Sequence, residues 1–363
     1  MHPITRRQAG AMALAGFGLA ACATSPDQLG PTEASPVQGV RFRMVQTNGI
    51  RLRVAEMGTE NTKAPLVVLA HGWPESWYSW RHQIPAIAAA GYRVIAPDMR
   101  GYGGSDRPPA IEDYDITHTS GDIVGLLDAY GAEKAVLIGH DWGAIVTWNT
   151  VLLHPDRFSA MVAMSVPNGG RAASPPLTGM RAAAGENFQY IVYANEPGGL
   201  AEKEYDSNPR GLLSGLYTSK DTPVDPPAVT DPKRSAGGWI PRLGKPKALP
   251  PWLTQADLDY FVSQFQQAGF RGGVNYYRNF DRNWEITPQL AGARIKAPVA
   301  FIAGVDDVVI RGAKEDALRT QMSRVADDLR DVKLVPGAGH WVQQEKPQEV
   351  NDFVLDFLAK VMT

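Results

Sequence analysis

The sequence predicts an α/β fold in which a parallel sheet carries a mainly helical insertion. Three observations predict this: apolar runs as long as buried strands, helical stretches between these runs, and a long middle region where the alternation stops. With 363 residues, 44% of them hydrophobic and 20% charged, the chain has an ordinary globular composition. Its 36 Lys and Arg against 38 Asp and Glu give a net charge of −2, which argues against nucleic-acid binding through a basic surface.

The first residues have the features of an export signal. Arg6 and Arg7 precede an uncharged run, Ala9–Ala21, which is too short to cross a hydrocarbon core of about 20 helical residues. The run ends in a sequence that resembles the lipobox of bacterial lipoproteins, Leu19-Ala20-Ala21-Cys22. A general secretory signal with an incidental thiol, and export by the twin-arginine route, remain alternatives.

We therefore expect residues 1–21 to be a signal peptide and Cys22 to be lipidated. Residues 22–39, rich in Pro, Ser and Thr, are expected to form a polar tether. The protein is then exported to the periplasm or cell envelope and contacts the membrane only through its N-terminal lipid. Because Cys22 is the single cysteine, the sequence excludes an intrachain disulfide and a Cys-based zinc site.

The first elements of the folded region form an antiparallel hairpin. Arg41–Gln46 and Ile50–Met57 flank Thr47-Asn48-Gly49, and Asn-Gly is typical of a type I′ turn. Uninterrupted apolar runs, which suit parallel strands buried on both faces, then recur at Leu66–Ala70, Val94–Pro97, Ala135–Gly139, Ala160–Val166 and Val299–Gly304. Helical stretches lie between them, including Ser120–Tyr130 and Gly143–Leu153.

The strand–helix rhythm stops in the middle of the chain. Residues 221–251 contain eight prolines, too many for regular structure, and such long loops are often functional or disordered. A helix with Thr254 as its N-cap follows and ends at Gly269. These features predict two core segments, 40–168 and 295–363, separated by a helical cap, 169–294.

A strand–turn–helix pattern presents an aspartate. Gly139-His140-Asp141-Trp142-Gly143 has the spacing of a nucleophile elbow, G-x-S-x-G, with Asp141 in place of serine. A carboxylate is already ionised near neutral pH and can attack an sp³ carbon directly. The resulting ester of Asp141 must then be hydrolysed, which requires a base to activate water. An ordinary turn with a capping aspartate is the alternative.

The groups needed for ester hydrolysis occur in the expected order. His71-Gly72-Trp73-Pro74 follows a strand, so its backbone can form an oxyanion hole from the N–H groups of Trp73 and Trp142. Acids follow the strand Val299–Gly304, and His340 follows the strand Val332–Val335. His340 is expected to be the general base, oriented by Asp307 or by its neighbour Asp306.

Together these motifs resemble the soluble epoxide hydrolase branch of the α/β-hydrolase superfamily. The resemblance rests on the elbow, on the His71–Pro74 loop and on Arg100-Gly101-Tyr102-Gly103-Gly104-Ser105-Asp106. It implies an α/β-hydrolase fold and favours Asp307 over Asp306. It also implies that two cap tyrosines, Tyr190 and Tyr277, hold the epoxide oxygen; Tyr193 and Tyr276 are their neighbours.

The resemblance implies an epoxide hydrolase that opens an epoxide to a vicinal diol through an alkyl ester of Asp141. A haloalkane-type dehalogenase, in which Trp142 binds halide, and a non-catalytic binding homologue are the alternatives. The expected partners are a small lipophilic epoxide and water. We expect no metal and no cofactor, because the seven histidines form no short metal-binding pattern and no GxGxxG loop follows a strand.

Overall fold

The computed structural model describes residues 34–362. The signal peptide predicted at 1–21, the lipidation site Cys22 and the first part of the tether lie outside the described residues. The described chain belongs to one compact unit. Among these residues, no helix combines the length and the apolar character that crossing a membrane requires.

The predicted N-terminal hairpin is confirmed. Strands β1 (Arg41–Thr47) and β2 (Ile50–Met57) pair antiparallel, with Thr47 opposite Ile50. Asn48 and Gly49 connect them with φ values of 43° and 79°, the left-handed conformation that a type I′ turn requires.

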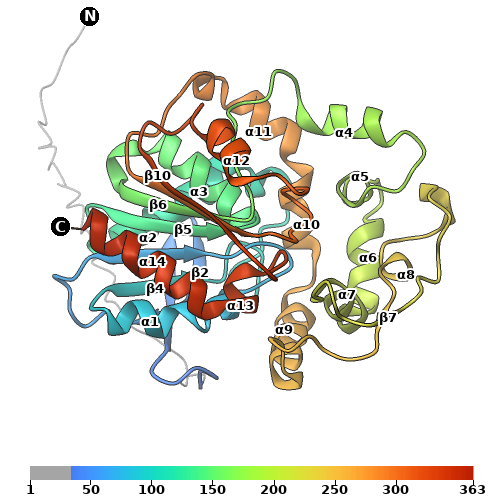
Figure 1. The fold of residues 1–363 in the computed structure, drawn as a ribbon, viewed down its shortest axis with the longest axis horizontal. Helices are drawn as coiled ribbons and strands as arrows, with labels where there is room; N and C mark the ends of the chain where they lie inside the picture. Colours follow the sequence, from blue (N-terminus) through green and yellow to red (C-terminus); the bar gives the residue numbers. More distant parts are fainter. Residues whose placement is uncertain (1–33, 363) are drawn as a thin grey trace, which may run out of the picture. The chain divides into compact units, whose positions relative to one another are not determined.

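The eight-stranded sheet has the order β1-β2-β4-β3-β5-β6-β9-β10 (Figure 1). The hairpin joins antiparallel to β4, and from β4 onward neighbouring strands are parallel. Beyond the hairpin, the strands are β3 (Leu66–Ala70), β4 (Arg93–Pro97), β5 (Ala135–His140), β6 (Phe158–Met164), β9 (Val299–Gly304) and β10 (Leu329–Val335). The strand expected at 160–166 ends at Met164, because Ser165 turns the chain with a φ of 68°.

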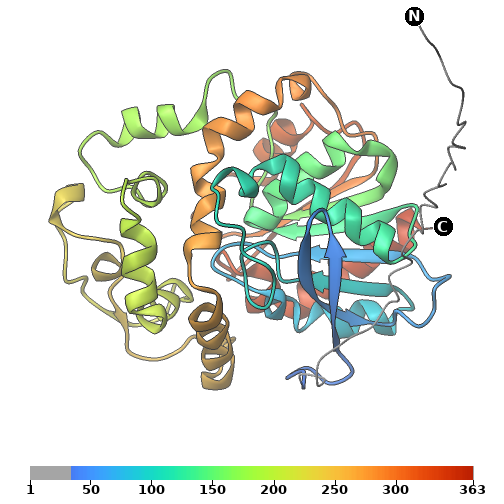
Figure 2. The ribbon, with the colours of Figure 1, turned by 180° about the vertical axis from the view of Figure 1, so that it is seen from behind.

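Helices cover both faces of this sheet, as burial of both faces requires. Helices α1 and α14 pack together on one face, and α2 and α3 pack together on the other (Figures 1 and 2). The helices outside the insertion are α1 (Gln83–Ala89), α2 (Ile116–Ala129), α3 (Trp142–Leu153), α12 (Glu315–Met322), α13 (Val342–Glu345) and α14 (Pro347–Val361).

The chain between β6 and β9 is mainly helical. Helices α9 to α11 lie between the sheet and helices α4 to α8 in both views (Figures 1 and 2). Their bounds are α4 (Pro176–Ala184), α5 (Tyr190–Ala194), α6 (Leu200–Ser207), α7 (Pro209–Leu216), α8 (Ile240–Leu243), α9 (Gln255–Ala268), α10 (Arg271–Arg278) and α11 (Phe280–Ile286). We call this insertion the cap; its boundaries at 169 and 294 stay a prediction.

The helix predicted after Thr254 is confirmed as α9. The Thr254 side chain accepts from the N–H of Asp257, whose carboxylate accepts from the N–H of Thr254, so the two form a capping box. Gly269 follows the helix with a φ of 70°. Asp257 also holds the cap to the core, because it accepts from the Tyr78 hydroxyl at 2.8 Å and pairs with Arg81 at 3.2 Å.

The proline-rich segment contains more regular structure than its composition predicts. Within residues 221–251, strands β7 (Val224–Asp225) and β8 (Lys245–Pro246) pair antiparallel, and α8 forms one helical turn. Each element is only two to four residues long. Such short elements tolerate proline, because few backbone N–H groups are needed as donors.

Candidate active site

Asp141 occupies a strained turn between β5 and α3. Its φ of 51° and ψ of −118° lie outside the regions that side chains usually adopt. Glycine flanks the turn on both sides because space is short: a Cβ on Gly139 would come within 2.1 Å of the Gly143 oxygen, and a Cβ on Gly143 within 1.9 Å of the Ala70 oxygen. The turn therefore presents the Asp141 carboxylate above the carboxyl ends of the strands.

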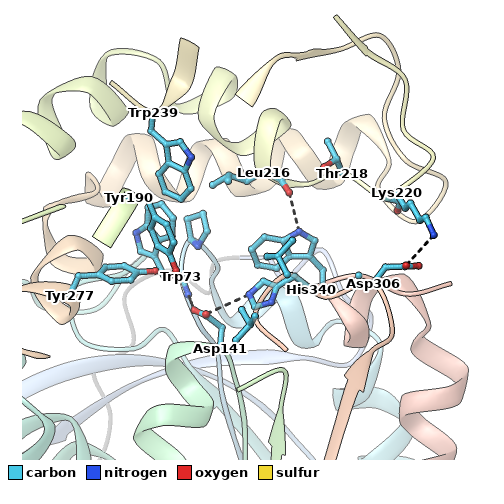
Figure 3. Close-up of a pocket in the computed structure, with 16 residues that line it drawn as sticks. Trp73, Asp141, Tyr190, Leu216, Thr218, Lys220, Trp239, Tyr277, Asp306 and His340 are labelled. Atoms are coloured by element: carbon cyan, nitrogen blue, oxygen red, sulfur yellow. Dashed lines mark hydrogen bonds and ion pairs between the residues drawn. The ribbon is translucent and has the colours of Figure 1, made fainter. Parts of the chain in front are cut away.

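His340 lies between two carboxylates. Its Nδ1 is 3.0 Å from Asp307 Oδ1, and its Nε2 is 3.5 Å from Asp141 Oδ2 (Figure 3 labels His340 and Asp141). Asp307 is buried and also accepts from the N–H of Val309. Asp306 instead pairs with Lys220 at 3.3 Å. The three-dimensional arrangement thus separates the two adjacent acids that the residue pattern alone left open.

Nearby charge shifts the pKa values of His340 and Asp307. Burial lowers the pKa of His340, but the charge of Asp307 and the contacts with Asp141 outweigh it and raise the pKa well above its ordinary value. Burial opposes ionisation of Asp307, yet the facing His340 lowers its pKa. The geometry therefore favours a protonated His340, which faces Asp307 through one ring nitrogen and Asp141 through the other.

Two loops bring backbone donors to Asp141. The N–H of Trp73, in the loop after β3, donates to Asp141 Oδ1 at 2.8 Å. Trp142 is the first residue of α3, where helical N–H groups have no partner within the helix. His71, which begins the same loop, has a structural role: its Nε2 accepts from the N–H of Met99 at 3.0 Å.

A buried ion pair between Glu75 and His140 holds the backbone next to this site. Glu75 Oε2 accepts from the N–H of Gly72 at 2.8 Å and is 2.8 Å from Nδ1 of His140. Nε2 of His140 lies 2.8 Å from the carbonyl oxygen of His340. Since a carboxylate and a carbonyl are both acceptors, His140 donates from both ring nitrogens. The other Glu75 oxygen accepts from two side-chain amides, those of Gln343 and Gln344.

The cap brings two tyrosines over Asp141. Tyr190, at the start of α5, and Tyr277, in α10, line the same cavity as Asp141 and His340, with their ring centroids 5.8 Å apart (Figure 3). Burial raises the pKa of both phenols, and the charge of Asp141 raises it further, so both keep their protons. A hydrogen bond from the Trp142 side chain acts in the opposite direction on Tyr277.

The neighbouring tyrosines point elsewhere. The Tyr276 hydroxyl donates to the carbonyl oxygen of Arg100 at 3.0 Å, and the Tyr193 hydroxyl to that of Leu200 at 3.4 Å. Neither lines the cavity. On α5 and on α10, one tyrosine therefore lines the cavity with Asp141 and its neighbour packs elsewhere in the protein.

The cavity holds about 470 Å³ and lies between cap and core. Aromatic and aliphatic side chains line most of it, while Lys220 and Asp306 form an ion pair at one end (Figure 3). Within residues 34–362, no group of three or more His, Cys, Asp or Glu side chains is placed to hold a metal.

Sequence reasoning missed three residues of this site: Glu75, Lys220 and Trp239. Glu75 follows the His71–Pro74 loop directly, so its place beside a buried motif was the available signal. Trp239 is the single tryptophan of the proline-rich segment, and a large aromatic side chain in a loop was the available signal for a packed position. Lys220 carried no signal, because surface lysines are common.

The sequence of this chain is similar to those of known hydrolases. Residues 65–196 match the sequence model of the alpha/beta hydrolase fold. Epoxide hydrolase A of Mycobacterium tuberculosis is 50% identical over 321 residues, 87% of this chain and 97% of that protein. Epoxide hydrolase 3 of Siraitia grosvenorii is 41% identical, over 87% of this chain and 97% of that protein.

Solved structures agree with the sequence relatives. The crystal structure of epoxide hydrolase A from Mycobacterium thermoresistibile superposes with a TM-score of 0.80 at 50% identity, covering 88% of this chain and 98% of that one. The α/β-hydrolase fold predicted from the sequence is confirmed. The chain belongs to the epoxide hydrolase family of α/β-hydrolases.

Proposed function

We propose that this protein hydrolyses a small lipophilic epoxide to a vicinal diol through a covalent ester of Asp141. One observation carries the proposal: the phenols of Tyr190 and Tyr277 line the same cavity as the Asp141 carboxylate and His340. A nucleophile, two proton donors and a base then surround one substrate-sized space. The similar proteins from Mycobacterium tuberculosis and Siraitia grosvenorii are epoxide hydrolases, which supports this activity.

In the first step, a carboxylate oxygen of Asp141 attacks one carbon of the epoxide. The bond between that carbon and the epoxide oxygen breaks, and its electron pair stays on the oxygen. The hydroxyls of Tyr190 and Tyr277 donate to this oxygen, and one of them supplies the proton. Because burial and nearby charge raise the pKa of both phenols, they enter the reaction as neutral donors.

In the second step, water attacks the carbonyl carbon of the Asp141 ester while His340 takes the proton. The N–H groups of Trp73 and Trp142 would hold the oxyanion that forms; the former already donates to Asp141 at 2.8 Å. When this intermediate collapses, the bond to the diol oxygen breaks and His340 returns a proton to it. The proton left on the Asp141 carboxyl group replaces the one that the tyrosine gave up in the first step. Water has then been added across the epoxide, and the Asp141 carboxylate and both phenols are restored.

The charges around His340 suit this order of events. In the free protein two carboxylates raise its pKa, so it is protonated. Ester formation removes the charge of Asp141, and with it one of the causes of the raised pKa. His340 therefore becomes a base most readily when the ester is present, while Asp307, 3.0 Å away, holds its orientation.

The test is a single turnover in heavy-oxygen water with excess protein. Because water attacks the ester carbonyl, the first turnover should place the heavy oxygen in Asp141 and not in the diol. A diol that carries the heavy oxygen after one turnover contradicts the covalent path. Release of halide from haloalkanes, with no diol formed from epoxides, favours the dehalogenase alternative.

We also propose that the protein is exported and anchored through a lipid on Cys22. Support comes only from the sequence: a basic start, a short apolar run and a lipobox-like end. The lipid chains of a lipoprotein would give stable anchoring where a single chain gives marginal binding.

A further inference from the structure

The proline-rich segment is a built part of the cavity wall. Its backbone pairs with the residues that lead into α5: the N–H of Phe188 donates to the oxygen of Pro232 at 2.7 Å, and the N–H of Arg234 to the oxygen of Glu186 at 2.8 Å. The segment therefore lies against the part of the cap that carries Tyr190.

Arg242 fixes the internal shape of this segment. Its guanidinium donates to the carbonyl oxygens of Asp231, at 2.5 Å, and Lys233, at 2.7 Å. The same group lies 4.6 Å from the ring centroid of Phe188, a cation–π contact. The Arg242 side chain thus connects distant parts of the segment and attaches the segment to the part of the cap that carries Tyr190.

Glu204, on α6, fixes the position of Trp239. Its carboxylate accepts from the backbone N–H groups of Trp239, at 2.9 Å, and Ile240, at 3.0 Å. The carboxylate reaches them because Gly238 has no side chain: a Cβ there would lie 2.2 Å from Glu204 Oε1. Trp239 is therefore held from its backbone, before any substrate is present.

The indole of Trp239 forms an aromatic wall with two residues of the candidate active site. It stacks on Tyr190 with centroids 4.7 Å apart and planes 21° apart, and on Trp73 at 5.5 Å and 9° (Figure 3 labels all three). Trp239 also lines the cavity that contains Asp141. Tyr277 adds a fourth ring, whose edge meets Tyr190 and Trp73.

We propose that Trp239 is a specificity-determining residue that selects epoxides bearing a flat aromatic substituent. This inference rests on the proposed epoxide hydrolysis. A substituent of the epoxide that extends along this wall would meet Trp239, which lines the cavity, and a planar ring packs closely against such a rigid aromatic wall. A saturated ring of the same size is thicker and makes a poorer contact with a fixed planar wall.

A matched pair of substrates measures the effect: styrene oxide and cyclohexyl oxirane, which have the same number of heavy atoms. The quantity is the ratio of kcat/KM for the phenyl epoxide to that for the cyclohexyl epoxide. Trp239→Leu should lower this ratio by about 3- to 10-fold, the size of one lost aromatic contact. Trp239→Phe keeps a planar ring and should retain most of it. Differences in intrinsic reactivity cancel, because each variant is compared with the wild type.

Trp284 provides the matched control. It is another cap tryptophan, on α11, and its ring contacts Arg171 outside the Asp141 cavity. Trp284→Leu should leave the ratio unchanged. An unchanged ratio in folded Trp239→Leu overturns the inference, as does an equal change in Trp284→Leu.

A second measurement requires no variant and covers the case in which Trp239→Leu does not fold. The phenyl diol should inhibit the wild-type protein more strongly than the cyclohexyl diol; equal inhibition contradicts the inference. Failure of the proposed function gives a different result, since the wild type would then form a diol from neither epoxide and carry no label on Asp141.

Discussion

Removing the hydroxyl groups of Tyr190 and Tyr277 tests the proposed ring opening most directly. Replacing either tyrosine by phenylalanine removes one oxygen and keeps the ring that packs in the cavity wall. The proposed role of these hydroxyls is to donate to the epoxide oxygen as it gains negative charge. Each variant should therefore slow formation of the Asp141 ester and leave hydrolysis of that ester nearly unchanged.

The magnitude follows from the loss of one donor to a developing oxyanion, which costs about 10²- to 10³-fold in rate. The two losses should not simply multiply, because the rings are 5.8 Å apart and the donors share one acceptor. Burial raises the pKa of both phenols, so we expect a loss of this order for each single variant.

The assay is pre-steady-state formation of the ester, followed by rapid quenching and intact-protein mass spectrometry. Tyr276→Phe and Tyr193→Phe are matched controls, because their hydroxyls donate to backbone carbonyls outside the cavity. These controls should react at the wild-type rate, even if they lose some stability through an unsatisfied carbonyl. Wild-type ester formation in both Tyr190→Phe and Tyr277→Phe would refute the reasoning.

Three further predictions concern His340, Glu75 and Cys22. His340→Gln should accumulate a substrate-sized mass increase on Asp141, and Asp141→Ala should show none; equal labelling of both variants would place the nucleophile elsewhere. In the wild type, hydrolysis of the ester should slow as falling pH protonates His340. Burial raises the pKa of Glu75, but the facing His140 outweighs this effect and lowers the pKa to about 2. Ionised Glu75 therefore stabilises the fold fully above the ordinary pKa of 4.5, and this stabilisation is lost as the pH falls toward about 2. The difference in unfolding free energy between wild type and Glu75→Gln, measured by denaturant titration, should therefore shrink from about pH 7 to about pH 3; a constant difference contradicts this. Cys22→Ser should release the protein from the membrane fraction and remove the lipid mass, and unchanged fractionation and mass would contradict lipidation.

The sequence alone was enough to predict most strands of the sheet and the turn that presents Asp141. Continuous apolar runs predict buried parallel strands because both faces of such a sheet are covered, and β3, β4, β5 and β9 lie where these runs occur. The elbow could be predicted from its glycines, since only residues without a Cβ fit beside Asp141. Such features depend on near neighbours in the chain, so a local pattern is enough to find them.

Local residue patterns left the choice between adjacent residues open. The family resemblance made that choice, and its physical cause lies in the tertiary structure. Asp306 and Asp307 are chemically identical, and only the fold directs one to His340 and the other to Lys220. Likewise, Tyr276 and Tyr277 differ by one position on α10, yet one bonds a backbone carbonyl and the other faces Asp141. The packing of the cap on the core decides where these side chains point, and a local sequence pattern contains no information on that packing.

The proline-rich segment shows the same division most clearly. Its composition predicted no regular structure, because proline removes backbone donors, but elements of two to four residues form there. Where the segment lies was decided by partners distant in sequence, such as Glu204, which holds the backbone of Trp239. Local sequence thus determined what this segment cannot form, and contacts between distant residues determined that it supplies an aromatic wall to the site.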